Sequence, residues 1–341
     1  MSDISQSHFR VLDYWGLQKP KTSLNPDLYK RKYWFRTLLT FRGTVIPKIF
    51  LRVMLITFLT LILNLLEHFK VWSAPELKIS VHSLMGVAMG LVLVYRTNSS
   101  YDRFHDGRRQ WGAIVNNCRN LLRFIATVER DVPSKQLSNL VASYCYALKN
   151  RLRGIFVIDE YSILLNNDAQ REYVSSTNNK PLTISCLMSE WIWTNCDMIR
   201  ENVYMYRCAE QYIGNLIDSQ GGLERIVLTP IPYSYLVQIH QILAAYLLTL
   251  PFCLQDFGWY SLPAVFLISF SLLGVEQAGI EMEDPFGVGP NNLPLDSICN
   301  NILDNLTAIS ARTFLLVDRV ERGHQEGSQQ TSETNITIKK H

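Results

Sequence analysis

The sequence lacks the short motifs that mark most enzymes and metal proteins. It contains no Cys-x-x-Cys pair, no His-Glu-x-x-His, no Gly-rich phosphate loop and no Gly-x-Ser-x-Gly elbow. None of its seven histidines has another suitable metal ligand four residues away. We therefore expect no enzymatic activity, no catalytic residue, no cofactor and no bound metal.

Several other features are scarce. The net charge is only +3 and no dense Lys/Arg run occurs, so nucleic acid is not an expected partner. The N-terminus lacks the basic start, apolar stretch and cleavage site of a signal peptide, and it is not an Arg/Ser-rich transit peptide. Strand-like alternation never lasts more than a few residues, and no internal repeat is visible. A β-protein and a repeat protein are both excluded.

Long apolar runs are present. Apolar residues make up 48% of the chain, yet the mean hydropathy is only +0.03, which indicates membrane spans joined to a large water-exposed part. A helix that crosses a bilayer needs roughly 20 mostly apolar residues. Four segments meet this requirement: 44–66, 79–95, the uncharged run 226–255 and 257–275. The predicted fold class is all-α, with four transmembrane helices and a large cytosolic helical region.

Positive charge predicts which parts face the cytosol. Arginines and lysines gather just before the first span and just after the second, so both termini and the long middle segment are expected in the cytosol. The expected domains are an N-terminal cytosolic segment 1–43, a first transmembrane pair 44–95, a cytosolic helical region 96–228, a second transmembrane pair 229–280, a C-terminal cytosolic helical segment 281–322 and a disordered tail 323–341.

Helical patterns fill the middle segment. The second span runs without a Gly/Pro loop into a charged stretch, which predicts one helix that leaves the membrane and continues in water. Further helices are expected at 134–152 and at 190–222, the latter ended by Gly221–Gly222, with a long loop at 164–183. The seven cysteines fall mostly in apolar stripes, so buried free thiols are expected.

Ionisable residues inside or beside the spans have two interpretations each. His82 and His240 lie inside predicted spans, where ionisable side chains are rare because burying a charge in the bilayer is costly, so each is a candidate for a functional role. The other interpretation is a neutral imidazole that hydrogen-bonds a neighbouring helix. The acidic residues of 276–284 are a cation site, or they form helix caps and salt bridges. The structural interpretation is favoured for both.

The second span has a face of small and aliphatic residues. Ser80, Leu84 and Ala88 recur every four residues, and Gly86 and Gly90 would let a neighbouring helix approach closely. The adjacent face carries Val81, Met85 and Met89. Such a helix either packs as an ordinary span or lines a narrow conduit, where a hydrophobic constriction can gate by dewetting.

Three motifs in order resemble those of one known family. "YRTNSSYDRFHDGRRQWG" resembles the Arg-x-Asn-x-x-Tyr-x-Arg signature at the end of the second membrane helix of bacterial and plant bestrophin-like proteins. "LTPIPYSYLVQIHQILAAYLLTLPF" is similar to the segment that opens their third span. "EDPFGVGPNNLPLDSIC" is similar to the element that follows their fourth. The resemblance covers about residues 30–315.

The resemblance implies a homopentameric ion channel around a central pore. Five copies of the second helix would form a hydrophobic neck, here Ser80, Leu84 and Ala88, or Val81, Met85 and Met89 if the register slips. By the same resemblance, a cytosolic constriction would lie near Tyr204, at the start of a helix, or near Val203. The residues implied at the family motifs and the pore mouth are Arg96, Asn98, Asp102, Arg103, Arg108, Asp284 and Pro285.

This chain departs from the animal members of that family in two respects. Its neck positions are not aromatic, and the acidic run that clasps calcium after Pro-Phe-Gly is replaced by "GVGPNNLPLD". We therefore expect a channel for chloride and similar monovalent anions without calcium gating. Alternatives are a cation-selective or bicarbonate-conducting channel of the same fold, or a membrane scaffold. The expected partners are the lipid bilayer and other copies of the chain, in a bacterial inner membrane or a thylakoid membrane.

Overall fold

The computed structural model describes residues 41, 43–72, 79–129, 132, 134–155, 159–162, 164–165 and 167–311. These residues form helices and contain no strand, which confirms the predicted all-α class. The chain divides into two compact units. We call Ser23–Arg108 with Arg225–Leu293 the span unit, and Arg109–Glu224 with the residues from Pro294 onward the core unit. The predicted tail 323–341 and nearly all of the predicted segment 1–43 lie outside the described residues.

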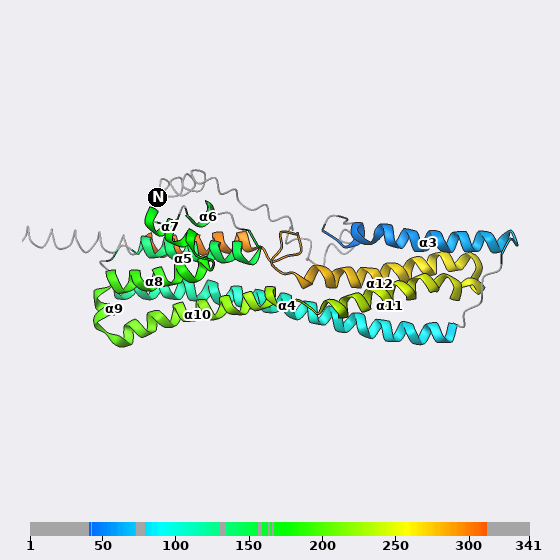
Figure 1. The fold of residues 1–341 in the computed structure, drawn as a ribbon, viewed down its shortest axis with the longest axis horizontal. Coiled ribbons are helices and arrows are strands. Elements are labelled where there is room, and N and C mark those ends of the chain that lie inside the picture. Colours follow the sequence, from blue (N-terminus) through cyan, green and yellow to red (C-terminus); the bar gives the residue numbers. More distant parts are fainter. Residues whose placement is uncertain are drawn as a thin grey trace, which may run out of the picture. The chain divides into compact units, whose positions relative to one another are not determined.

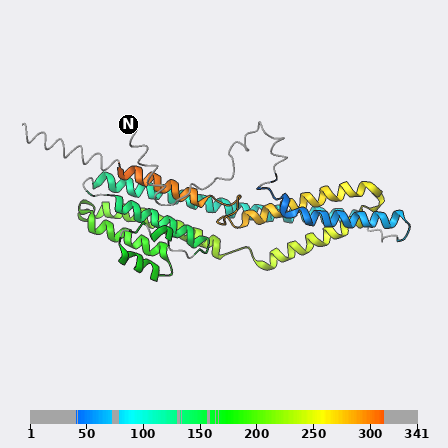
Figure 2. The same ribbon diagram turned by 90° about the horizontal axis from the view of Figure 1, so that it is seen from above.

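The span unit contains four helices that are long and apolar enough to cross a membrane, as predicted. Helices α3, α11, α12 and the first part of α4 lie alongside one another in both ribbon views (Figures 1 and 2). Their bounds are α3 Ile46–His68, α4 Ile79–Val128, α11 Tyr233–Cys253 and α12 Ser261–Glu283, with a short 3-10 helix, η3, at Gln255–Tyr260. A shared apolar core lies between them, with Val53, Met89, Leu243 and Val265 among its members.

Proline and glycine set the ends of these helices. Helix α3 has Pro47 in its first turn, and α11 begins directly after Pro232, because proline has no N–H to lose at a helix start. The turn between α11 and α12 passes through Gly258 at φ +50° and ψ −130°, a conformation open to glycine alone. Asn64 of α3 fixes this turn by donating to Gly258 O at 3.2 Å and to Ser261 Oγ at 2.9 Å.

Helix α4 is continuous from Ile79 to Val128. It contains the second span and the charged stretch after it without a break, which confirms the predicted continuous helix. The sequence after the second span predicts one buried helix face, because its members follow alternating steps of three and four residues: Tyr101, Phe104, Arg108, Trp111, Val115, Cys118 and Leu122. The prediction is correct for Trp111, Cys118 and Leu122, which are fully buried in the core unit. It is wrong for Tyr101, which is 54% exposed, and for Arg108, which is also exposed.

The core unit is a bundle of shorter helices. They are the second part of α4, α5 Lys135–Leu152, α6 Asp159–Ser162, α7 Asp168–Ser176, α8 Lys180–Asn195, α9 Asp197–Glu201, most of α10 Val203–Leu228, and a helix over residues 295–311. The predicted helix 134–152 is confirmed by α5. Fourteen of the eighteen residues of α5 are buried, so this helix forms the centre of the bundle.

Two expectations for this region are wrong. The predicted loop 164–183 contains α7, which begins because the Asn167 side chain accepts a hydrogen bond from Ala169 N. The predicted helix 190–222 is interrupted at Cys196 and Asn202, where the backbone leaves the helical region. It also continues through Gly221–Gly222 to Leu228. A side chain at Gly222 would meet the amide group of Gln110 at 3.0 Å, so glycine here permits close packing and does not end the helix.

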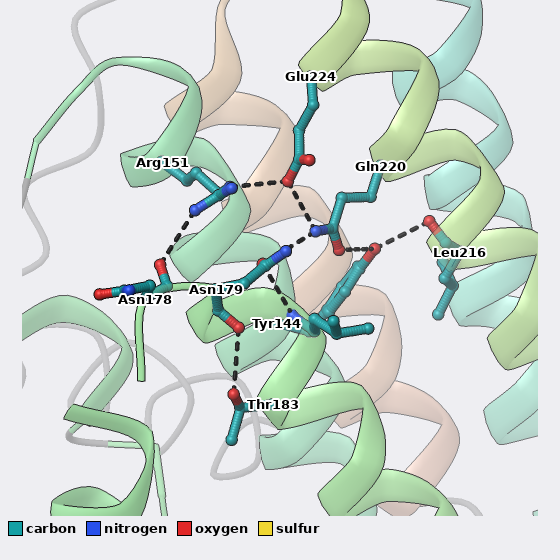
Figure 3. A network of polar contacts seen from close by, with 9 residues as sticks. Tyr144, Arg151, Asn178, Asn179, Thr183, Leu216, Gln220 and Glu224 are labelled. Carbon is teal, nitrogen blue, oxygen red and sulfur yellow. Dashed lines mark hydrogen bonds and ion pairs between the residues drawn. The ribbon is translucent and has the colours of Figure 1, made fainter. Parts of the chain in front are cut away.

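A polar network holds α5, α8 and α10 together (Figure 3). The Tyr144 hydroxyl donates to Leu216 O at 2.9 Å, with Gln220 Oε1 3.3 Å away. Gln220 Nε2 donates to Asn179 Oδ1 at 3.1 Å and to Glu224 Oε1 at 2.8 Å. Burial raises the pKa of Tyr144 well above its usual value, with further contributions from Cys145, Cys118 and Glu224, so this hydroxyl stays a donor.

All seven cysteines are free, as expected. Five are buried, whereas Cys186 and Cys208 are exposed, so the prediction of burial is wrong for these two. Burial, followed by the charges of Glu129 and Asp197, raises the pKa of Cys196 to about 12. This thiol is therefore protonated at neutral pH.

Candidate functional site

Helix α4 packs against the rest of the span unit along one narrow stripe. The residues that face its neighbours recur at steps of three or four: His82, Gly86, Met89, Leu93, Arg96 and Ser100. Only 17% of its membrane-spanning window is buried within the described chain, compared with 33% for α3 and for α11. Of the four candidate spans, α4 therefore has the most side-chain surface left for lipid or other copies of the chain.

The predicted neck residues lie on the opposite side of α4. Because successive residues turn about 100° around a helix, Leu84 points about 200° away from His82. Leu84 is 73% exposed, and Ser80 and Ala88 are exposed with it. The same face continues through Leu91 and Tyr95 to Asn98 and Asp102, all of which are exposed. The structure thus places five of the predicted site residues on one uncovered face: Ser80, Leu84, Ala88, Asn98 and Asp102.

The alternative register does not follow an uncovered face. Val81 and Met85 are exposed, but Met89 is only 3% exposed and belongs to the apolar core of the span unit. The line from Val81 to Met89 therefore turns into the packing stripe. This geometry favours Ser80, Leu84 and Ala88 as the uncovered set.

Arg96 lies in a buried cluster of charges. Its Nη1 is 3.5 Å from Glu276 Oε1 and its Nη2 is 3.7 Å from Glu283 Oε2, and its side chain is 2% exposed. Glu276 also contacts His240 Nε2 at 2.6 Å and Arg52 Nη1 at 3.7 Å. A buried arginine is tolerated because carboxylates pair with it. Arg96 therefore joins α4 to α12 and does not face the exposed side of α4.

Two further contacts fix α4 about two and three turns beyond Arg96: the hydrogen bonds of Arg103 and the packing of the Asp-Pro-Phe-Gly element on Gly107. Arg103 donates to Ile226 O at 2.6 Å and to Thr229 O at 2.7 Å, which satisfies carbonyl groups at the end of α10. A side chain at Gly107 would lie 3.1 Å from the Phe286 ring and 3.4 Å from Pro285, so glycine lets the element pack closely on α4. These motif residues act in packing, whereas Arg108 is exposed.

The Asp284 side chain shapes the same element. Asp284 Oδ1 accepts from Phe286 N at 3.2 Å. Asn292 donates to Asp284 O, and Leu293 N donates to Pro285 O at 2.8 Å. Asp284 therefore serves the turn, and the described residues contain no group of three or more potential metal ligands there or elsewhere.

The two span histidines both bond a neighbouring helix. His82 Nε2 lies 3.2 Å from Tyr246 O and 3.3 Å from Thr249 Oγ1. The imidazole ring stacks on the Tyr246 ring, with the two ring centroids 4.1 Å apart. A side chain at Gly86 would lie 2.8 Å from the Tyr246 hydroxyl, so the predicted close approach is present at this glycine. Gly90 has no heavy atom of a neighbour within 4 Å of a side-chain position, so the same expectation fails there.

Val203 and Tyr204 stand at the start of α10, as expected. Asn202 precedes the helix, and its Oδ1 accepts from Tyr204 N at 3.0 Å. Helix α9, directly before it, is anchored by Glu129 Oε1, which accepts from Ile199 N at 2.9 Å. Val203 is 76% exposed and Tyr204 is 81% exposed. Two large apolar side chains are thus presented to solvent by a helix start with fixed geometry.

Comparison with known proteins identifies the family. The family model described as bacterial/fungal bestrophin protein matches residues 28–308, most of the chain. The chain belongs to the bestrophin family. A voltage-dependent anion channel-forming protein of Nostoc sp. is 35% identical over 90% of this bestrophin and 99% of its own length. A voltage-dependent anion channel-forming protein of Synechocystis sp. is 32% identical over 81% of this chain and 91% of its own.

Solved structures agree with this assignment. A bacterial bestrophin homologue from Klebsiella pneumoniae is 25% identical and superposes with a TM-score of 0.72, over 77% of this chain and 99% of that one. The family resemblance inferred from the three motifs is thereby confirmed. With four apolar helices of spanning length, this bestrophin is a membrane protein.

Sequence reasoning missed the partners of Arg96. The predicted salt bridges of the acidic residues 276–284 are present at Glu276, but a helix cap is not, because α12 continues to Glu283 and Glu276 lies within the helix with its side chain 1% exposed. A signal was available, because an acidic residue inside a span usually has a basic partner in another span. His240 and Arg52 stand in two other spans and both contact Glu276.

Proposed function

We propose that this bestrophin is a passive anion channel that conducts chloride and similar monovalent anions. The observation that carries the proposal is the exposed face of α4, which runs from Ser80 through Leu84 and Ala88 without a charged residue. The names of the Nostoc and Synechocystis relatives, which describe voltage-dependent anion channel-forming proteins, support anions as the cargo. They also favour voltage as the stimulus.

The pore needs several copies of the chain, and we propose a homopentamer. Five α4 helices would surround the axis, with Ser80, Leu84 and Ala88 as the neck, while Val203 and Tyr204 would form a second constriction. An ion at such a neck loses hydration and meets no fixed positive side chain, so a short hydrophobic constriction sets the barrier. Residues 96–130 contain an excess of four positive charges, which raises the local anion concentration at the mouth.

Orientation and gating complete the proposal. The excess of basic residues after the second span favours a cytosolic position for the core unit. The proposed membrane is a bacterial inner membrane or a thylakoid membrane. Exposed aromatic residues at the other end of the span unit, Phe69, Trp72, Trp259 and Tyr260, suit the opposite lipid–water interface. Calcium is not the proposed stimulus, because Asp284 is engaged in its own turn.

Reconstitution in liposomes tests the function. In a potassium chloride gradient, the reversal potential of purified protein is expected near the chloride equilibrium potential. A reversal near the potassium potential would replace the proposal with a cation channel, and a bicarbonate permeability above that of chloride would change the cargo. Absence of flux would favour a membrane scaffold.

Substitution of the neck tests the assignment of the pore. We expect Leu84→Ala and Tyr204→Ala each to raise single-channel conductance, since a barrier lower by about 0.7 kcal/mol speeds permeation about threefold. Val81→Ala removes a similar exposed side chain from the adjacent face of α4 and is expected to leave conductance unchanged. Unchanged current in both Leu84→Ala and Tyr204→Ala would refute the neck and the second constriction.

A further inference from the structure

A cavity of about 410 Å³ opens within the span unit between α3, α11 and α12. Its polar end is formed by Arg52, His240 and Glu276, and its apolar wall includes Leu243, Leu247 and Leu273. No residue of α4 lines it. The cavity is therefore separate from the uncovered face of α4 on which the proposed conduction path depends.

The polar end has unused hydrogen-bonding capacity of both kinds. Among the described residues, Arg52 makes one ion pair, at 3.7 Å to Glu276 Oε2, and its side chain is 55% exposed. A guanidinium carries five N–H donors, so most of the donors of Arg52 remain available. Glu276 Oε2 is buried and accepts no hydrogen bond from the described residues. An unsatisfied buried acceptor costs about 1–3 kcal/mol, which favours a ligand that brings a donor to this atom.

The charges near this end are balanced without a ligand. Arg52 and Arg96 face Glu276 and Glu283, two of each sign, while His240 Nε2 contacts Glu276 Oε1 at 2.6 Å. Arg96 is enclosed between the two carboxylates, but Arg52 is half-exposed at the cavity. A ligand with one negative charge and one hydroxyl group would match Arg52 and Glu276 Oε2 at the same time.

The apolar wall fits a hydrocarbon chain. Leu243 and Leu247 are one turn apart on α11, and Leu273 faces them from α12, so the three form a continuous apolar surface beside the charged end. The cavity lies in helices that cross the bilayer, where the surrounding molecules are phospholipids. Although the cluster as a whole is balanced, the half-exposed Arg52 presents a positive charge to the cavity, and basic side chains between transmembrane helices are typical partners of anionic lipid headgroups.

We propose that this cavity binds an anionic glycerophospholipid whose headgroup carries hydroxyls, the chemistry of phosphatidylglycerol. Its phosphate accepts hydrogen bonds from Arg52, a headgroup hydroxyl donates to Glu276 Oε2, and one acyl chain lies along Leu243 and Leu247. The site goes beyond the proposed channel function, because lipid binding is measured without ion flux. Failure of one proposal therefore leaves the other intact.

Native mass spectrometry of the full chain, purified in detergent and titrated with defined lipids, tests the site. Phosphatidylglycerol is expected to remain bound at up to one molecule per subunit, while phosphatidylcholine is removed. Arg52→Gln is expected to weaken phosphatidylglycerol binding about tenfold, the loss of one charge-assisted hydrogen bond. Lys48→Gln removes a positive charge one turn earlier on α3, outside the cavity, and is expected to leave binding unchanged.

A second pair of variants keeps every charge. Ala244→Phe places an aromatic ring in the cavity and is expected to displace the lipid. Ala245→Phe changes the next exposed residue of α11, which does not line the cavity, and is expected to leave lipid binding unchanged. Equal binding of both lipids, full binding by Arg52→Gln, or equal loss in Lys48→Gln would overturn the proposal. Displacement of the lipid by millimolar inorganic phosphate would also overturn it, because the site would then hold a free anion.

Discussion

The core unit and the span unit differ in how much of their helix surface is buried. In the core unit, α5 is buried on nearly all sides, and its Tyr144 hydroxyl joins a hydrogen-bonded network with α10. In the span unit, no candidate span has more than 33% of its membrane window buried, and Arg96 and Glu276 form an ion pair whose two side chains are at most 2% exposed. The core unit resembles the interior of a soluble domain, whereas the span unit leaves most of its apolar surface for lipid and neighbouring subunits.

The difference in burial between the two units indicates which side chains are available to contact ions. A side chain buried among helices of one subunit contributes to stability and is hidden from ions. The exposed side chains of α4, such as Leu84, contribute little to the stability of the subunit and are free to serve a pore. Substitutions that separate stability from conduction therefore test the difference between the two units.

The largest effect is expected for the buried charges of the span unit. Arg96→Gln would leave Glu276 and Glu283 without their buried partner, and breaking a buried ion pair costs about 3–5 kcal/mol of the free energy of unfolding. Unfolding in mixed micelles with increasing dodecyl sulfate measures this cost. Arg108→Gln removes the same charge from an exposed position of α4 and is expected to change stability by less than about 0.5 kcal/mol. Equal effects of the two variants would show that the cluster around Arg96 is not stabilising.

The next largest effect on the free energy of unfolding is expected for a Leu→Ala substitution in the core unit, compared with the same substitution in the span unit. Leu122 is fully buried in the core unit, so Leu122→Ala is expected to cost about 2–5 kcal/mol by leaving a cavity. Leu84 is 73% exposed, so Leu84→Ala is expected to change the free energy of unfolding by less than about 0.5 kcal/mol while it alters conductance. A large loss of stability in Leu84→Ala would mean that this side chain packs within the subunit, and the comparison between the units would fail.

Much of this division could be predicted from sequence. The spans were predictable because a run of about 20 apolar residues with few charges is typical of a transmembrane helix. The continuity of α4 was predictable because no Gly/Pro loop follows Tyr95. The start of α10 near Tyr204 was found through a family motif, since nothing local to that residue distinguishes it from other exposed tyrosines.

Features that depend on single side-chain contacts or on contacts between distant residues could not be predicted from the sequence. Helix α7 was missed because its start depends on one Asn167 side chain in a polar stretch. The Gly221–Gly222 pair predicts a helix end, but α10 continues through it, and Gly222 permits close packing against Gln110. The pairing of Arg96 with Glu276 joins residues 180 positions apart, and no local pattern records such a distance.

The smallest effect concerns acid stability of the core unit. Burial alone raises the pKa of Asp296, but hydrogen bonds and charge from Lys149, and then from Arg153, outweigh burial and hold that pKa below its usual value. Lys149 Nζ lies 2.9 Å from Asp296 Oδ1, and Arg153 Nη1 lies 2.9 Å from Asp296 Oδ2.

A lowered carboxyl pKa sets the sign of the pH dependence. The unfolded chain takes up the proton first, so the stabilisation is complete above the usual pKa of about 3.9 and is lost as the pH falls through the lower folded value. Because Asp296 is 44% exposed, solvent screening keeps the contribution below about 1 kcal/mol. Unfolding measured between pH 6 and pH 3 is expected to show a shallower acid loss in Asp296→Asn than in the parent chain. Parallel pH profiles would show that Asp296 is not stabilised by Lys149 and Arg153 in the folded core unit.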